Sequence, residues 1–361
     1  MPIAAEKPAS QITGAVLKQR QAYPLDIKVR MTLTRIGHWY DLYGGNVYVA
    51  FSGGKDSTVL LHLVRSVFPE VPAVFVDTGL EYPEIKDFVR DTDNVTWLRP
   101  ALTFKQVLDH HGWPVISKAV ADAVNRIRSP GTSARTKHKA MYGDERGSFG
   151  KLPQKWRWLL GAPFAISPRC CEVMKIRPVQ KYHKETGRAS FVGVMAGDSN
   201  KRSRAYLKHG CYQADLAVPK CTPMAFWTDL DVWDYLDRYE VPYCPIYDGG
   251  VSHTGCMFCC FGLQHETEPN RFQLMQYSHP EIYRYCMDKL GLRDVLTWLG
   301  LPFEIEQRPP LCPRRRREAH LLGQDGMAPG GLGAGRGHLD AHDYAARSDP
   351  AAPQPAPDCV Q

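Results

Sequence analysis

A glycine-rich turn directly after a short apolar run is the feature that most constrains the fold of this chain. The run is Val47-Tyr48-Val49-Ala50-Phe51, and the turn is Ser52-Gly53-Gly54-Lys55-Asp56-Ser57. A strand, two glycines and a helix that begins near Ser57 would point backbone N–H groups and the positive helix end at an anion, and Lys55 adds a full charge. The spacing differs from the Walker loop, Gly-x-x-x-x-Gly-Lys before Ser or Thr. A Gly-Gly pair alone can be a plain connection, but six fitting residues predict a phosphate-binding turn.

Strand and helix patterns alternate around this turn. Helices are predicted over residues 26–43, 57–67, 82–90 and 229–239, and strands over residues 47–51, 73–76, 95–98 and 191–195. This order predicts an α/β fold, a doubly wound parallel sheet with helices on both faces. Ligands of such sheets bind at the carboxyl ends of strands where the winding reverses, so the loops after Phe51, Val76 and Met195 are expected to converge.

Composition divides the chain into three parts. Residues 1–25 are predicted to be a polar leader, residues 26–307 a nucleotide-binding domain, and residues 308–361, rich in Gly, Ala, Pro and Arg, a disordered tail. Within the domain, residues 118–168 form a basic insertion or lid, and residues 244–300 a small cysteine-rich helical part. The first twenty residues suggest no signal peptide and no segment reaches the ~18 apolar residues of a membrane span. A cytoplasmic location without membrane contact is expected.

The insertion carries most of the excess positive charge. Between Lys118 and Arg157 there are ten Lys or Arg residues and three acids, in a chain with a formal net charge of +7. Solvated surface charge and a binding surface for RNA or DNA explain this excess equally well. Both interpretations remain open from the sequence.

Four of the eleven cysteines form two close pairs. Cys170 and Cys171 are adjacent, and Cys256 and Cys259 form a Cys-x-x-Cys. Two pairs of thiolates can hold a 4Fe-4S cluster or a tetrahedral zinc. Adjacent ligands fit neighbouring irons better than one zinc ion, so the sequence favours the cluster over zinc and over no metal. Cys260 could replace Cys259 as a ligand, or lie buried beside it.

These motifs together resemble the phosphoadenosine phosphosulfate (PAPS) reductase family, within the adenine nucleotide alpha hydrolase-like superfamily, and residues 52–57 resemble the pyrophosphate (PP) loop of ATP pyrophosphatases. The resemblance covers about residues 47–299 and is carried by residues 52–57, 76–83, 170–178, 227–233 and 255–262. It implies a Rossmann-like fold that binds an adenine nucleotide. The implied nucleotide-binding residues are Ser52, Gly53, Gly54, Lys55, Asp56, Ser57, Asp77, Thr78, Gly79, Glu81 and Asp198, with Arg202 on the third loop. In cluster-containing members the matching cysteines bind 4Fe-4S, which implies that role for Cys170, Cys171, Cys256 and Cys259.

Two departures from the family pattern bear on activity. True reductases end in a tail with Glu-Cys-Gly-Leu-His, which this chain lacks, although Cys312 or Cys359 could substitute as the nucleophile. The reductases generally lack the complete Gly-Gly-Lys-Asp turn, which ATP-cleaving relatives keep. The complete turn therefore favours ATP over adenylyl sulfate or PAPS.

The resulting hypothesis is an ATP-dependent adenylation coupled to sulfur transfer. Lys55, Asp56 and Arg202 are the predicted catalytic residues, and Mg²⁺ is expected to bridge the phosphates near Asp56 or Asp77. One alternative is a reductase that forms sulfite from adenylyl sulfate or PAPS with a dithiol reductant. Another is a non-catalytic nucleotide and iron-sulfur module that regulates or binds nucleic acid. The sequence names neither the sulfur donor, nor the acceptor, nor the oligomeric state.

Overall fold

The main sheet has six strands in the order β3-β2-β1-β5-β7-β6, and only β6 runs antiparallel to its neighbour. The computed structural model describes residues 12–144, 150–251 and 254–307. The strands are β1 Val47–Ala50, β2 Ala73–Val76, β3 Val95–Leu98, β4 Val115–Ile116, β5 Ala189–Val192, β6 Tyr212–Gln213, β7 Lys220–Cys221 and β8 Cys260–Phe261. Strands β4 and β8 pair in parallel as a separate two-stranded sheet.

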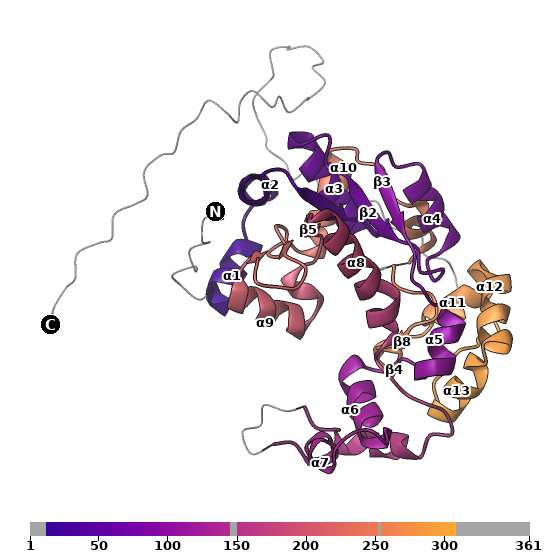
Figure 1. Ribbon diagram of the computed structural model, residues 1–361. Coiled ribbons are helices and arrows are strands. Elements are labelled where there is room, and N and C mark those ends of the chain that lie inside the picture. Colours follow the sequence, from indigo (N-terminus) through magenta and orange to yellow (C-terminus); the bar gives the residue numbers. More distant parts are fainter. Residues whose placement is uncertain (1–11, 145–149, 252–253, 308–361) are drawn as a thin grey trace, which may run out of the picture.

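Helices surround the main sheet and extend beyond it (Figure 1). They are α1 Gly14–Gln21, α2 Leu25–Leu42, α3 Lys55–Val67, α4 Pro83–Arg90, α5 Phe104–His111, α6 Lys118–Arg128, α7 Ala134–Tyr142, α8 Arg177–Thr186, α9 Asn200–His209, α10 Asp229–Arg238, α11 Arg271–Ser278, α12 Pro280–Arg284 and α13 Leu292–Leu299. No helix in the described ranges is long and apolar enough to cross a membrane.

The predicted doubly wound α/β sheet is confirmed. The chain runs outward from β1 to β2 and β3, then returns to place β5 on the other side of β1. Side chains alternate between the faces: Tyr48 and Val74 pack with Tyr182 of α8, whereas Val49 and Phe75 join the main core with α3. The winding therefore reverses between β1 and β5, where a ligand is expected.

One boundary differs from the prediction and matters for the site. Helix α3 begins at Lys55, two residues before the predicted start at Ser57. Gly53 adopts a φ of +71°, which favours glycine, and Gly54 is the extended N-cap residue. Lys55 is thus the first residue of the helix, and its position is fixed by regular structure.

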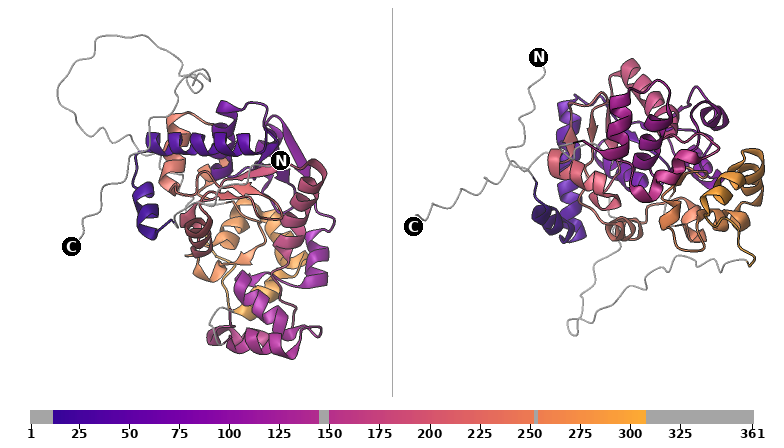
Figure 2. Two further views of the ribbon diagram at one scale, coloured as in Figure 1. Left: turned by 60° about the vertical axis from the view of Figure 1, so that its left-hand side comes forward. Right: turned by 90° about the horizontal axis from the view of Figure 1, so that it is seen from below.

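The basic insertion is helical, and most of its buried side chains belong to the main core. It contains α6, α7 and the 3₁₀ helix Gln154–Gly161, and Val120, Val124 and Leu159 are buried in it. Ser117 and Ser133 cap α6 and α7 by accepting hydrogen bonds from backbone N–H groups. Figures 1 and 2 show this lobe projecting from the sheet.

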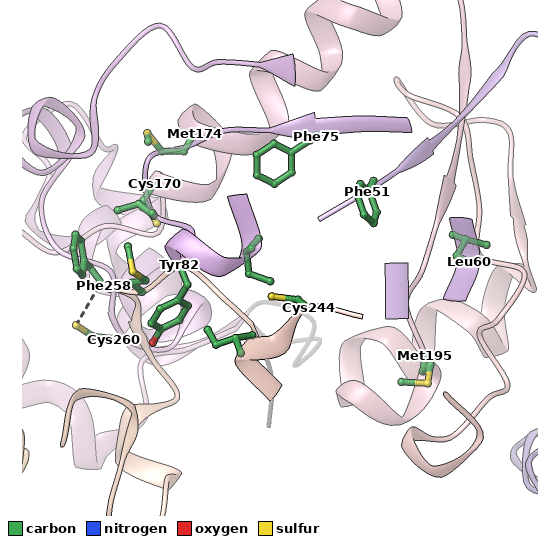
Figure 3. Close-up of a cluster of buried hydrophobic side chains, with 14 of the residues drawn as sticks. Phe51, Leu60, Phe75, Tyr82, Cys170, Met174, Met195, Cys244, Phe258 and Cys260 are labelled. Atoms are coloured by element: carbon green, nitrogen blue, oxygen red, sulfur yellow. Dashed lines mark hydrogen bonds between the residues drawn. The ribbon is translucent and has the colours of Figure 1, made fainter. Parts of the chain in front are cut away.

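The cysteine-rich part continues the main core. Helices α11 to α13 are present as predicted, and Figure 3 shows one line of buried side chains from Phe51 and Phe75, past Tyr82, to Cys170 and Phe258. Buried contact between the sheet and the cysteines holds the two regions together. The predicted tail, residues 308–361, and most of the predicted leader lie outside the described residues.

Candidate active site

A cavity of about 860 Å³ opens at the carboxyl ends of β1, β2 and β5. Residues at the end of each strand line it, including Phe51, Val76 and Val194. The lining continues through the phosphate-binding turn on one side and Lys175 on another. The cavity therefore lies where the sheet topology predicts a ligand.

Hydroxyl groups occupy the hydrogen-bond positions of the phosphate-binding turn. The N–H of Ser52 donates to Ser57 Oγ (3.1 Å), that of Gly54 to Ser52 Oγ (3.4 Å), and that of Lys55 to the hydroxyl of Tyr247 (2.9 Å). The amide of Lys55 belongs to the first residue of α3, where the helix dipole favours an anion. A phosphate oxygen can take the place of such neutral acceptors.

Lys55 is buried between two carboxylates. Its side chain is 5% exposed, and Nζ lies 2.7 Å from Asp56 Oδ1 and 2.6 Å from Asp229 Oδ1. Burial lowers the pKa of Lys55, but the two carboxylates more than offset this, so the pKa is raised. Burial raises the pKa of Asp56, and the ion pair with Lys55 cancels only part of that rise. The site thus combines a permanent cation with two acids.

The β5 loop approaches the turn at a glycine. A Cβ on Gly193 would lie 2.9 Å from the carbonyl oxygen of Asp56, too close for the backbone to stay in place. We expect Gly193→Ala to displace the turn and weaken ATP binding about tenfold or more, because overpacking against backbone costs ~1–3 kcal/mol. Gly197→Ala is the matched control, since a Cβ there meets nothing within 4 Å. Titration calorimetry with ATP measures both; equal affinities would contradict the steric argument.

The predicted second nucleotide loop enters the site only in part. Glu81 lines the cavity and accepts hydrogen bonds from the N–H and hydroxyl of Thr78 at 3.0 and 2.7 Å. Asp77 instead pairs with Lys86 (3.0 Å) and Arg99 (3.5 Å). Among the described residues that line the cavity, Asp77, Thr78 and Gly79 are absent. Asp56 is therefore better placed than Asp77 for Mg²⁺.

The third predicted loop contributes one acid and one cation. Asp198 and Arg202 both line the cavity and are ion-paired with each other. Asp198 also accepts the N–H of Met195 at 2.9 Å, which fixes the loop after β5. The Arg202 side chain is 47% exposed. Because the side chain is already half exposed, Arg202 can exchange Asp198 for an anionic ligand without exposing much buried surface.

The four predicted cluster ligands face a common region. Cys170 and Cys171 precede the π-helical turn Glu172–Ile176, with their Sγ atoms 3.9 Å apart, and Cys256 and Cys259 precede β8. The hydrogen bond with Cys171, burial, and the nearby thiols of Cys259 and Cys256 all raise the pKa of Cys170. Within the described residues, no group of three or more His, Cys, Asp or Glu side chains is arranged so that it could hold a metal ion.

Cys260 is separated from this group. It lies in β8, is fully buried, and its Sγ points to the carbonyl of Phe258 at 3.8 Å (Figure 3). Its burial and its contact with the Phe258 carbonyl favour the interpretation that Cys260 is a buried thiol beside Cys259 over the interpretation that it replaces Cys259 as a ligand.

Lys175 connects the cysteines with the cavity. It lines the cavity, lies 4.0 Å from Glu81 Oε1, and hydrogen-bonds to Cys256. Burial lowers the pKa of Lys175, whereas Cys256 and Glu81 raise it above its usual value. One ammonium group therefore contacts both halves of the site.

Comparison with known proteins identifies the fold's relatives. A family model described as the phosphoadenosine phosphosulfate reductase domain matches residues 46–128 and 133–261. The chain belongs to the PAPS reductase family. An adenosine 5'-phosphosulfate reductase of Geobacillus kaustophilus is 23% identical over 258 residues, 70% of this chain and 87% of that enzyme. An uncharacterised protein of Methanocaldococcus jannaschii is 26% identical over 239 residues, 65% of this chain, but the chain spans only 40% of its length.

Two solved structures are also similar to this PAPS reductase family member. A PAPS reductase from Candida auris, in complex with phosphate, has a TM-score of 0.37 and 16% identity, covering 69% of this chain and 98% of that one. A U34-tRNA thiolase from Methanococcus maripaludis, solved with its [4Fe-4S] cluster, has a TM-score of 0.33 and 15% identity, covering 80% and 84%.

Sequence reasoning missed three residues of this family member's candidate site. Tyr247, Asp229 and Lys175 were not predicted as site residues, although Asp229 and Lys175 lie inside motifs that carry the resemblance. Residues 118–168 were predicted as an insertion or lid. Of the described residues in that segment, none lines the cavity, and the role as a lid stays a prediction.

Proposed function

We propose that this protein uses Mg²⁺-ATP to adenylate an acceptor oxygen, and that a sulfide-level sulfur atom then displaces AMP. The observation that carries the proposal is the buried Lys55 ammonium at the start of α3, held beside Asp56 and Asp229 in the 860 Å³ cavity. Membership of the PAPS reductase family supports an adenine nucleotide and sulfur chemistry.

The carboxylates favour ATP with a divalent cation over a sulfated nucleotide. Asp56, Asp198 and Asp229 are close enough that the charges of the latter two raise the pKa of Asp56. Such a group repels a bare polyphosphate unless a cation lies between them. Mg²⁺ is commonly bound by one or two carboxylates together with substrate phosphates and waters, so no complete protein cage is needed.

The chain's own residues can perform the first step. The turn amides and Lys55 hold the β- and γ-phosphates, and Arg202 can stabilise charge on the α-phosphate. The acceptor oxygen forms a bond to the α-phosphorus as the bond to pyrophosphate breaks, and the acceptor proton is lost to solvent. In the second step HS⁻ attacks the carbon that carries the adenylated oxygen, and AMP leaves with that oxygen. No electrons are gained or lost overall.

The donor set of the four cysteines fits an iron-sulfur cluster. Four thiols from two segments face a common region, and Lys118, Lys175 and Arg271 place positive charge around the thiols. Since each thiolate binds a different iron, a cluster spreads its ligands more widely than a single ion does. When bound, such a cluster supplies iron atoms that can hold or activate sulfur next to the cavity.

The test is one binding measurement and one activity assay with the anaerobically purified protein. We expect Mg²⁺ to strengthen ATP binding, and we expect no sulfite from adenylyl sulfate or PAPS with a dithiol reductant. Sulfite formed at catalytic rates would overturn the proposal in favour of the reductase alternative. Cys312 and Cys359, its potential nucleophiles, lie outside the described residues, and their Ser variants would then identify the attacking thiol.

A further inference from the structure

Within the basic insertion, helix α7 and the 3₁₀ helix Gln154–Gly161 carry exposed positive charge, whereas Arg126 of α6 pairs with Asp122. Helix α7 contains three Lys or Arg residues and no acid, and the 3₁₀ helix Gln154–Gly161 contains two and no acid. Arg135, Lys155 and Arg157 are exposed, and no carboxylate in the described ranges forms a salt bridge with any of them. Charge that only keeps a helix soluble is usually mixed in sign, so this one-sided surface indicates an anionic partner.

Aromatic rings lie exposed among these cations. The Tyr142 side chain is 58% exposed and the Trp158 side chain 43%. The guanidinium of Arg157 lies 5.5 Å from the centre of the Tyr142 ring, and the His138 ring lies 4.9 Å from it. Trp158 also packs on Trp298, which explains part of its position, but Tyr142 has no such role in the core. Exposed rings beside cations bind unstacked bases, whereas a simple polyanion needs only the charge.

A second acid-free helix, α9, contributes a residue to the lining of the cavity. Helix α9 contains four Lys or Arg residues and no acid, and Lys201, Arg204 and Lys208 are exposed. Arg202 of the same helix lines the nucleotide cavity. In Figure 1 the molecule has a curved outline, with α7 near one end and α9 near the other. A phosphodiester chain that binds along α9 comes next to the nucleotide cavity, because Arg202 of that helix lines it.

We propose that α7, the 3₁₀ helix Gln154–Gly161 and α9 form a surface that binds single-stranded nucleic acid, and that this nucleic acid carries the acceptor oxygen. This proposal rests on the proposed function, and it names the class of molecule that carries the acceptor oxygen, a nucleic acid. Single strands are favoured over duplexes because the Tyr142 ring can stack only on a base that is free of its neighbours.

The first experiment measures binding of fluorescein-labelled single-stranded RNA and DNA of about 16 nucleotides by anisotropy at several salt concentrations. We expect affinity to fall steeply with salt. The triple variant Arg135→Ala/Lys155→Ala/Arg157→Ala should reduce the salt slope by about 2, since each lost phosphate contact contributes ~0.7. Tyr142→Ala should weaken binding about tenfold at every salt concentration, because a stacked base contributes ~1–3 kcal/mol.

The matched control is Arg90→Ala/Lys105→Ala/Arg238→Ala, which removes the same charge from exposed positions on α4, α5 and α10. We expect it to bind like the wild type. Equal weakening by both triple variants, preference for duplex, or equally tight binding of inorganic polyphosphate would overturn the proposal. Comparison of the RNA and DNA arms shows which of the two is bound.

Two parallel measurements separate this proposal from the proposed function. ATP binding should be unchanged in Tyr142→Ala and in the triple variant of Arg135, Lys155 and Arg157, because none of these residues lines the cavity. If the wild type binds oligonucleotide but not Mg²⁺-ATP, the proposed adenylation is wrong, whereas the proposed nucleic-acid-binding surface is confirmed. If it binds both, the oligonucleotide should stimulate pyrophosphate release several-fold, and no stimulation by RNA or DNA would overturn its role as acceptor.

Discussion

Lys55→Met should reduce affinity for Mg²⁺-ATP at least a hundredfold while leaving the protein folded. The ammonium is 5% exposed and is the cation of the phosphate-binding turn, and charge-assisted hydrogen bonds contribute ~1.5–3 kcal/mol each. Its loss also leaves Asp56 and Asp229 facing the phosphates without the charge that neutralises them. Methionine retains an apolar stem of similar length, so the start of α3 should remain packed.

Titration calorimetry with ATP and Mg²⁺, together with thermal unfolding, measures both effects. Lys105→Met is the matched control, since the Lys105 side chain is 61% exposed on α5 and its ion pair is with Asp109 on the same helix. The control should bind ATP like the wild type. An unchanged affinity in Lys55→Met would remove the phosphate-binding role of the turn.

Cys256→Ser/Cys259→Ser should lower the iron content from about four atoms per chain to less than one and abolish turnover. The same result is expected for Cys170→Ser/Cys171→Ser, because each pair supplies two of the four ligands. Burial raises the pKa of Cys256 to about 11, so the thiol of the metal-free protein is protonated at neutral pH. Cluster binding must then displace protons, and affinity for iron should rise with pH.

Anaerobic purification, iron and sulfide analysis and the visible spectrum test this expectation. Cys211→Ala/Cys221→Ala removes two thiols from buried positions at the β6 and β7 edge and should retain the iron. A colourless wild-type protein with stoichiometric zinc would favour the tetrahedral site instead. Iron retained in both Cys256→Ser/Cys259→Ser and Cys170→Ser/Cys171→Ser would show that other residues hold the metal.

The sequence predicted those parts of the site that depend on local pattern. The turn at residues 52–57 follows a buried strand, so the local pattern of strand, glycines and helix places Lys55 in the connection between β1 and α3. Tyr247 lies 192 residues from Lys55 and meets it only through the fold. No local signal marks such a partner, and the same holds for Lys175 beside Cys256.

Asp77 illustrates a different limit. The motif at residues 76–83 resembles a nucleotide loop, and Glu81 does line the cavity. Asp77, however, faces Lys86 from the first turns of α4 and Arg99 from the end of β3, and both cations compete for its carboxylate. Identity of a residue in a motif does not reveal which neighbouring charge it will pair with.

The pairing of β4 with β8 sets an order of events during synthesis of the chain. The side chain of Gln264 donates to the carbonyl of Ile116, 148 residues earlier, at the end of this small parallel sheet. Contacts over such a sequence separation form late, because the intervening chain must first be made and closed. A nascent chain that ends before Cys256 already contains the phosphate-binding turn but only two of the four thiols. The set of four thiols is therefore complete only after residue 259 has been made, whereas the phosphate-binding turn is made much earlier.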